Sequence, residues 1–89
     1  MENRIVLDCS GMVDEASVHD AFARTLNFPE YYGRTLDALY DLLSTASELN
    51  LVLTHTEAIA KLFRYGDNLM LTLRDAAEAN PNFTFEVQE

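Results

Sequence analysis

Three segments of the chain have the apolar patterns of β-strands. In an extended segment over residues 4–9, Val6 lies on one face and the other apolar residues lie on the opposite face. Because both faces carry apolar side chains, this pattern predicts a central strand covered on both sides. Residues 49–54 are apolar and partly β-branched, as in a buried strand. Phenylalanine and valine alternate with polar residues over residues 83–87 and predict a third strand.

Two helices are predicted between the first two strands. From Asp14 or Glu15 to Leu26, apolar residues recur every four positions and acidic residues gather in the first turn, as in an amphipathic helix. Thr35 is a suitable N-cap for a second helix over residues 36–44, whose leucines share one face. The segment between these helices contains proline, tyrosine and glycine, which predict a turn.

A short helix is predicted after the second strand. Thr54 and Glu57 have the Thr-x-x-Glu spacing of a capping box, which indicates where this helix begins. Its apolar residues continue to Phe63, and Gly66 is expected to end it.

A longer helix completes the predicted order of elements. Asp67 or Asn68 can cap it, and Asn80-Pro81 stops it near Ala79. Strands separated by two helices cannot form hairpins, so we expect them to be parallel and to be joined by right-handed crossovers. The sequence therefore predicts an α/β domain of order β-α-α-β-α-α-β, with a three-stranded parallel sheet in two layers or a thin sandwich.

The composition fits one small domain. With 89 residues, of which 48% are hydrophobic, residues 1–89 are expected to form one unit with its own core. Cys9 is the one cysteine, which excludes an intrachain disulfide, and it is expected to lie in the core. Apolar runs are far shorter than the ~20 residues that cross a bilayer, and no secretory signal is recognisable, so we expect a cytoplasmic protein.

The charge balance is strongly acidic. Fifteen Asp and Glu residues against six Lys and Arg residues give a net charge of -9. Such a surface repels phosphate backbones and anionic lipid, and the basic residues are scattered singly along the chain. We therefore expect no direct binding to nucleic acid or membranes. Acidity that serves only solubility is the alternative at this point.

One face of the helix over residues 36–44 concentrates negative charge. Asp37 and Asp41 lie one turn apart, opposite the leucines, together with Tyr40 and Ser44. The two carboxylates repel each other by about 0.2–0.5 kcal/mol, and no Lys or Arg on that face relieves them. Either the face is simply solvated, with Asp37 favoured by the helix N-terminus, or it binds a partner.

The loop before this helix favours a binding role. Tyr31 and Tyr32 are expected to be exposed beside the two carboxylates. Exposed aromatic side chains next to fixed charges are typical of protein-binding hot spots. The sequence therefore predicts a protein-binding surface here.

Catalysis and metal binding have less support in the residue pattern. Paired carboxylates serve glycosidases and two-metal nucleases, but one helix face on so small a domain offers little concavity. His19 and His55 have no partner at ligand spacing, and both are expected at the surface. Two aspartates lack the oxygens that calcium requires, and the glycines form no phosphate-binding pattern. We expect neither an enzyme nor a metal or cofactor site.

Residues 28–43, FPEYYGRTLDALYDLL, resemble the signature of the barstar family. Members of this family are intracellular inhibitors of small microbial ribonucleases. The resemblance implies a small parallel three-stranded sheet packed with helices, in agreement with the apolar pattern. It also implies an immunity or antitoxin protein whose carboxylates mimic RNA phosphates. Such a protein would be a monomer when free and would form a 1:1 complex with a basic, extracellular or toxin-type ribonuclease.

The resemblance implies roles for individual residues as well. Asp41 would enter the principal phosphate site of the ribonuclease, Asp37 would pair with a guanidinium, and Tyr31 would pack on the catalytic histidine. Asp75 would be a further acidic contact from the longer helix. The complete set of expected contact residues is Tyr31, Tyr32, Gly33, Thr35, Asp37, Tyr40, Asp41, Ser44 and Asp75.

The sequence departs from the family pattern at some of these positions. Tyr40 replaces the usual tryptophan, Thr35 replaces a common asparagine, and Asp75 is one methylene shorter than glutamate. The alternative is therefore an acidic module of the same fold that binds a different basic protein, not a ribonuclease.

Overall fold

The order of strands and helices matches the prediction. The structure is a computed structural model that describes residues 4–88. Its strands are β1 (Arg4–Asp8), β2 (Leu49–Thr54) and β3 (Phe83–Gln88). Its helices are α1 (Glu15–Leu26), α2 (Leu36–Ser44), α3 (Glu57–Ala60) and α4 (Arg64–Ala79). The β-α-α-β-α-α-β order and the three-stranded parallel sheet are confirmed.

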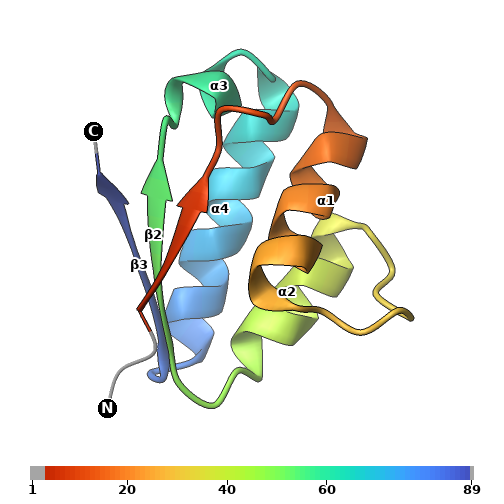
Figure 1. Cartoon of the computed structure of the whole chain (residues 1–89). Coiled ribbons are helices and arrows are strands. Elements are labelled where there is room, and N and C mark those ends of the chain that lie inside the picture. The colour runs from red at the N-terminus through yellow and green to blue at the C-terminus, as the bar shows by residue number, and fades with distance from the viewer. Residues whose placement is uncertain (1–3, 89) are drawn as a thin grey trace.

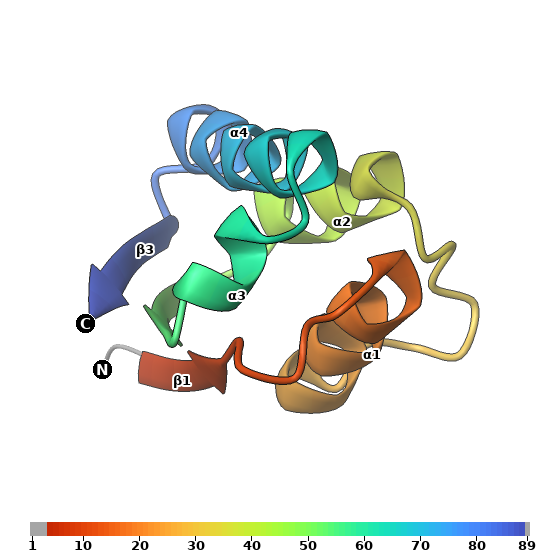
Figure 2. The same cartoon turned by 90° about the horizontal axis from the view of Figure 1, so that it is seen from above.

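The sheet is covered by helices on one face only. Its strand order is β1-β2-β3, so β2 is central and β1 is an edge strand, which corrects the prediction that residues 4–9 form a covered central strand. Successive right-handed crossovers in one direction place their helices on the same side of a sheet. Figures 1 and 2 show α1, α2 and α4 on that side, while α3 lies at the end to which the strands point. On the opposite side Val6 is 55% exposed, and the domain has two layers.

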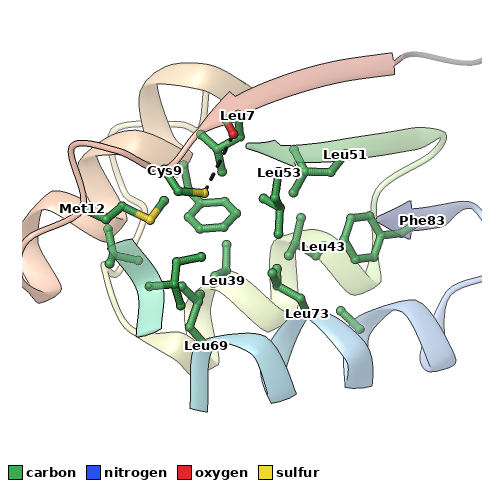
Figure 3. Packing of buried hydrophobic residues seen from close by; sticks show 14 of the residues in the cluster. Leu7, Cys9, Met12, Leu39, Leu43, Leu51, Leu53, Leu69, Leu73 and Phe83 are labelled. Atoms are coloured by element: carbon green, nitrogen blue, oxygen red, sulfur yellow. Dashed lines mark hydrogen bonds between the residues drawn. The ribbon is translucent and has the colours of Figure 1, made fainter. Parts of the chain in front are cut away.

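The hydrophobic core lies between the sheet and the helices (Figure 3). Its fully buried leucines come from β1, β2, α2 and α4: Leu7, Leu51, Leu53, Leu39, Leu43, Leu69 and Leu73. Burying one leucine side chain stabilises a fold by roughly 1.5–3 kcal/mol. Cys9 lies in the same core with 0% exposure, as predicted, and burial raises the pKa of its thiol to about 11.

Side-chain caps explain where α1 and α2 begin. The Asp14 carboxylate accepts from the backbone N–H of Ser17 at 2.8 Å, and the Ser17 hydroxyl accepts from the Asp14 N–H at 3.0 Å. This reciprocal arrangement satisfies donors that the first helical turn leaves without a partner. Thr35 Oγ1 accepts from the N–H of Ala38 at 3.1 Å, which confirms the predicted N-cap of α2.

The predicted capping box before α3 is not formed. The residue at the N-cap is Thr56, and it makes no side-chain cap hydrogen bond. The Thr54 hydroxyl instead donates to the carbonyl of Leu7 on the neighbouring strand at 3.5 Å. Because Thr54 still belongs to β2, the Thr54–Glu57 spacing does not mark the beginning of this helix.

Gly66 lies inside α4 and does not end the preceding helix. A Cβ atom at this position would be 2.1 Å from the carbonyl oxygen of Ile59, so the missing side chain lets α4 approach α3 closely. The glycine is therefore required by packing between two helices. The expected caps Asp67 and Asn68 consequently lie within the first turns of α4, which begins at Arg64.

Candidate protein-binding site

The loop between α1 and α2, residues 27–35, which we call the tyrosine loop, and the exposed face of α2 form one continuous surface. A shallow pocket of about 180 Å³ lies between them. Its lining residues are Tyr31, Tyr32, Gly33, Ala38, Asp41 and Leu42. The fold therefore brings the tyrosine loop and Asp41 together, although they belong to different elements.

The two loop tyrosines have opposite environments. Tyr31 is 85% exposed, whereas Tyr32 is 7% exposed, so the expectation that both are exposed is wrong for Tyr32. The Tyr32 ring packs against Phe28 with the ring centroids 4.8 Å apart. Of these two tyrosines, Tyr31 exposes its ring to solvent, and Tyr32 attaches the loop to the core.

His19 on α1 is buried, which corrects the prediction of a surface histidine. It is 2% exposed, and its two ring nitrogens lie 2.6 Å from the hydroxyls of Tyr32 and Tyr65. Burial lowers the pKa of His19, and the nearby Arg34 cation lowers it further. Burial also raises the pKa of Tyr32 to about 12 and raises the pKa of Tyr65. The fold thus favours the neutral form of every member of this network.

The sequence signal for this network was weak. The hydroxyl partners of His19 lie 13 and 46 residues away along the chain. A buried imidazole is tolerated when both of its nitrogens are hydrogen-bonded, and only the folded chain supplies these two partners. A polar residue beside the apolar stripe of α1 was the one available hint.

Arg34 attaches the other end of the loop to α1. Its guanidinium donates to the carboxylate of Asp20 and to the carbonyl oxygen of Ala16. Between the attached residues, Gly33 approaches α2 closely, since a Cβ atom there would lie 3.2 Å from the Cβ of Ala38. The loop is therefore held against both helices while part of it faces solvent.

Asp37 and Asp41, which we call the acidic pair, are exposed on α2. Within residues 4–88 neither carboxylate forms an ion pair, and the last turn of α2 has no basic residue. Carboxylates one helical turn apart repel each other by about 0.2–0.5 kcal/mol. The described part of the chain does not neutralise the acidic pair, so its charge is available to a cationic partner.

The remaining expected contact residues differ in their surroundings. The hydroxyl of Thr35 is used as the cap of α2, and that of Ser44 donates to the backbone carbonyl of Asp41 at 3.3 Å. Tyr40 is half-buried and packs against the core, so it does not lie fully opposite the leucines as predicted. Asp75 is exposed on α4, which packs beside α2 (Figure 2), but it does not line the pocket.

Metal ligands and membrane-spanning helices would each indicate a different kind of function. Within residues 4–88, no three His, Cys, Asp or Glu side chains are grouped so that they could hold a metal ion. Over the same residues, no helix combines the length and the apolar character needed to span a membrane. His55 is exposed as predicted, and its Nδ1 lies 3.4 Å from the Asp8 carboxylate.

The similarity of this chain to known proteins covers most of its length and not only the tyrosine loop and α2. Residues 3–88 match the model of the family described as Barstar (barnase inhibitor). The protein named "Putative ribonuclease inhibitor YrdF" from Bacillus subtilis (strain 168) is similar to this chain, with 35% identity over 78 residues. That alignment covers 84% of this chain and 86% of the Bacillus subtilis protein. The likeness therefore includes the sheet and the core as well as the candidate site.

Proposed function

This chain belongs to the barstar family, and we propose that it inhibits a small microbial ribonuclease by occupying the cationic active site of that enzyme. The observation that supports this proposal most strongly is the acidic pair. Asp37 and Asp41 are exposed and unpaired within residues 4–88, and the exposed Tyr31 belongs to the same surface. A partner with clustered cations supplies the ion pairs that Asp37 and Asp41 do not form within residues 4–88.

The proposed mechanism is mimicry of RNA. Ribonucleases bind RNA phosphates through Arg, Lys and His side chains, and such side chains also bind carboxylates through charge-assisted hydrogen bonds. Asp41 enters the principal phosphate site, Asp37 pairs with a neighbouring guanidinium, and Tyr31 packs on the active-site histidine. Substrate is then excluded because its phosphate positions are already filled.

The inhibitor needs no chemistry of its own in this scheme. Its carboxylates bind cations on an open surface, in a 1:1 complex, and the free protein is a monomer. A net charge of -9 also attracts a basic enzyme over distances beyond direct contact. An organism that produces a toxic ribonuclease would be protected by such an immunity protein in its cytoplasm.

An RNA cleavage assay tests this function. Small basic ribonucleases are titrated with the chain at low salt, and we expect activity to fall linearly to zero at one equivalent. The charge-neutral double variant Asp37→Asn/Asp41→Asn should fail to inhibit. The control Glu78→Gln removes an exposed carboxylate from α4 and should inhibit like the parent. Full activity of every ribonuclease with excess parent chain would contradict the proposal, as would full inhibition by the double variant.

A second candidate is an acidic module of the same fold that binds a different basic protein. The surroundings of Thr35 and Tyr40 favour it. The Thr35 hydroxyl is already used to cap α2, and the Tyr40 side chain is half-buried against the core. The contact surface therefore has few groups that select a particular enzyme. Ribonucleases that neither bind the chain nor lose activity, together with a basic protein of another class that binds the parent but not Asp37→Asn/Asp41→Asn, would support this candidate over the first.

A further inference from the structure

The residues of the tyrosine loop alternate between solvent and α1. Tyr31 and Gly33 are exposed, while Tyr32 and Arg34 are hydrogen-bonded to groups of α1. Tyr31 lies in a turn that is closed by the hydrogen bond from the Tyr32 N–H to the Pro29 carbonyl at 3.0 Å. Gly33 lies between the two anchored residues, so anchoring Tyr32 and Arg34 restricts both exposed residues. The exposed part of the loop therefore depends on how firmly α1 holds Tyr32 and Arg34.

We propose that His19 is a positioning residue for inhibition, which holds Tyr32 and thereby presents Tyr31 and Gly33 to the ribonuclease. This inference rests on the proposed function. His19 is 2% exposed and lies beneath the loop, so it does not reach a partner itself. Any effect of His19 on inhibition must pass through the residues that it contacts.

The hydrogen-bonding capacities of the three side chains fit one arrangement. A neutral imidazole offers one donor and one acceptor, and each tyrosine hydroxyl offers one donor. Tyr32 is almost fully buried, whereas the half-buried Tyr65 lines an open pocket of about 430 Å³. We therefore assign the Tyr32 hydroxyl as the donor to Nδ1 of His19 and Nε2–H as the donor to the Tyr65 oxygen, which leaves the Tyr65 hydroxyl hydrogen to turn towards the open pocket. No buried hydroxyl hydrogen is left without an acceptor in this arrangement.

Protonation of His19 would disturb this arrangement. Both ring nitrogens would then donate, and the Tyr32 hydroxyl hydrogen would need a new acceptor in a buried place. The charged groups that act on His19 are Arg34 from the loop and Glu15 and Asp20 from α1. The Arg34 cation opposes a second positive charge, and each of the two carboxylates acts in the opposite direction with a smaller effect than Arg34. The same cation holds the next anchored position of the loop, so the two anchors are coupled.

A loop that is released from α1 would still reach the bound conformation, but less often. Apparent affinity falls in proportion to the population of the competent conformation. If release leaves about one tenth of the molecules competent, inhibition weakens about tenfold and the association rate falls by the same factor. Loss of a direct contact would instead appear mainly in the dissociation rate.

The test compares three single variants of α1 in the full chain. His19→Leu removes both hydrogen bonds, and His19→Gln keeps one donor and one acceptor. Val18→Ala is the control, because Val18 is fully buried beside His19 and shortening it destabilises the core without removing either hydrogen bond. Two readouts are measured: association and dissociation rates with an inhibited ribonuclease, and backbone NMR order parameters of Tyr31 and Gly33 in the free protein.

We expect His19→Leu to slow association about tenfold and to lower both order parameters from ~0.85 towards 0.6 or less. His19→Gln should recover part of both effects, and Val18→Ala should show neither. Unchanged order parameters in His19→Leu would overturn the proposal, and so would an equal loss of inhibition in Val18→Ala. If the parent inhibits no ribonuclease, the proposed function fails, while lowered order parameters in His19→Leu would still support the positioning role.

Discussion

Helices α1 and α2 are neighbouring amphipathic helices with acidic residues, but they use those residues differently. On α1, the carboxylate before the helix caps it, and Asp20 pairs with Arg34 of the loop. On α2, Asp37 and Asp41 form no ion pair within residues 4–88. Asp14 and Asp20 therefore stabilise the fold, whereas the two carboxylates of α2 add repulsion to it.

Helix α1 supports the tyrosine loop, whereas helix α2 exposes the acidic pair. α1 holds the tyrosine loop through His19 and through the Asp20–Arg34 pair. α2 contributes Asp41 to the pocket that the loop partly lines. Acidic residues in one small domain can therefore have different roles, and the groups that each carboxylate contacts distinguish these roles.

The largest expected effect concerns binding by α2. Asp41→Ala should weaken the complex with a ribonuclease by about 2–5 kcal/mol, because it removes charge-assisted hydrogen bonds and leaves enzyme cations unpaired. Truncating Asp37 or Tyr31 should cost less, and truncating Asp75 least. Inhibition constants for the four alanine variants measure this order. A larger loss for Asp75 than for Asp41 would place the centre of the interface on α4 and contradict the role assigned to α2.

The next effect concerns the rate at which the complex forms. A chain of net charge -9 should associate with a basic ribonuclease at roughly 10⁸ M⁻¹s⁻¹ or faster at low salt. Screening between ~10 mM and ~500 mM salt should reduce this rate at least about tenfold. Stopped-flow mixing measures it. A rate that does not change with salt would show that electrostatic steering has no part in partner choice.

A smaller effect concerns stability and α1. Asp14→Ala removes the reciprocal cap with Ser17 and should lower the free energy of unfolding by about 1 kcal/mol, within a range of about 0.5–2 kcal/mol. Inhibition at temperatures well below unfolding should stay unchanged, because the cap is not part of the pocket. Urea unfolding and the RNA cleavage assay give the two numbers. A variant that keeps its stability but loses inhibition would reverse the roles assigned to the two helices.

The smallest effect is a pH dependence from the histidine network. The pKa of His19 in the folded chain is lower than its ordinary value of 6.5, so between these values the unfolded chain binds more protons. The free energy of unfolding should therefore fall as the pH drops below about 6.5 and through the folded pKa. At the alkaline end, the Tyr32 pKa of about 12 makes stability fall as the pH rises above about 10.

Urea unfolding of the parent and of His19→Gln between about pH 5 and pH 8 isolates this dependence, because other groups titrate in both proteins. The stability difference between parent and variant should shrink as the pH falls. Parallel pH profiles would mean that the protonation of His19 is not linked to folding.

Most of the fold was predictable because apolar residues recur at regular spacings within its strands and helices. The alternation in β3 and the four-residue spacing in α1 require no knowledge of the rest of the chain. The junction of α3 and α4 was mispredicted because Gly66 resembles a helix end in the sequence. Its actual cause is the backbone of Ile59, which comes within contact distance only after the two helices pack.

The candidate site was predictable in part, for a similar reason. The spacing of Asp37 and Asp41 on one helix face follows from helical geometry alone. The burial of His19 and Tyr32 depends on hydrogen bonds between α1, the loop and α4, and it has no local signature. Sequence periodicity therefore located the charged face but could not identify what holds the loop beside it.

The most direct test of the division between α1 and α2 is one paired measurement on Asp41→Asn, which keeps the side-chain shape and removes the charge. The free energy of unfolding should stay the same or rise by about 0.2–0.5 kcal/mol, because repulsion with Asp37 is removed. On the same preparation, inhibition of the ribonuclease should weaken at least about tenfold, since a neutral amide makes weaker hydrogen bonds with cations. A variant that unfolds more easily and yet inhibits as well as the parent would show that this carboxylate serves the fold, and the central claim would be wrong.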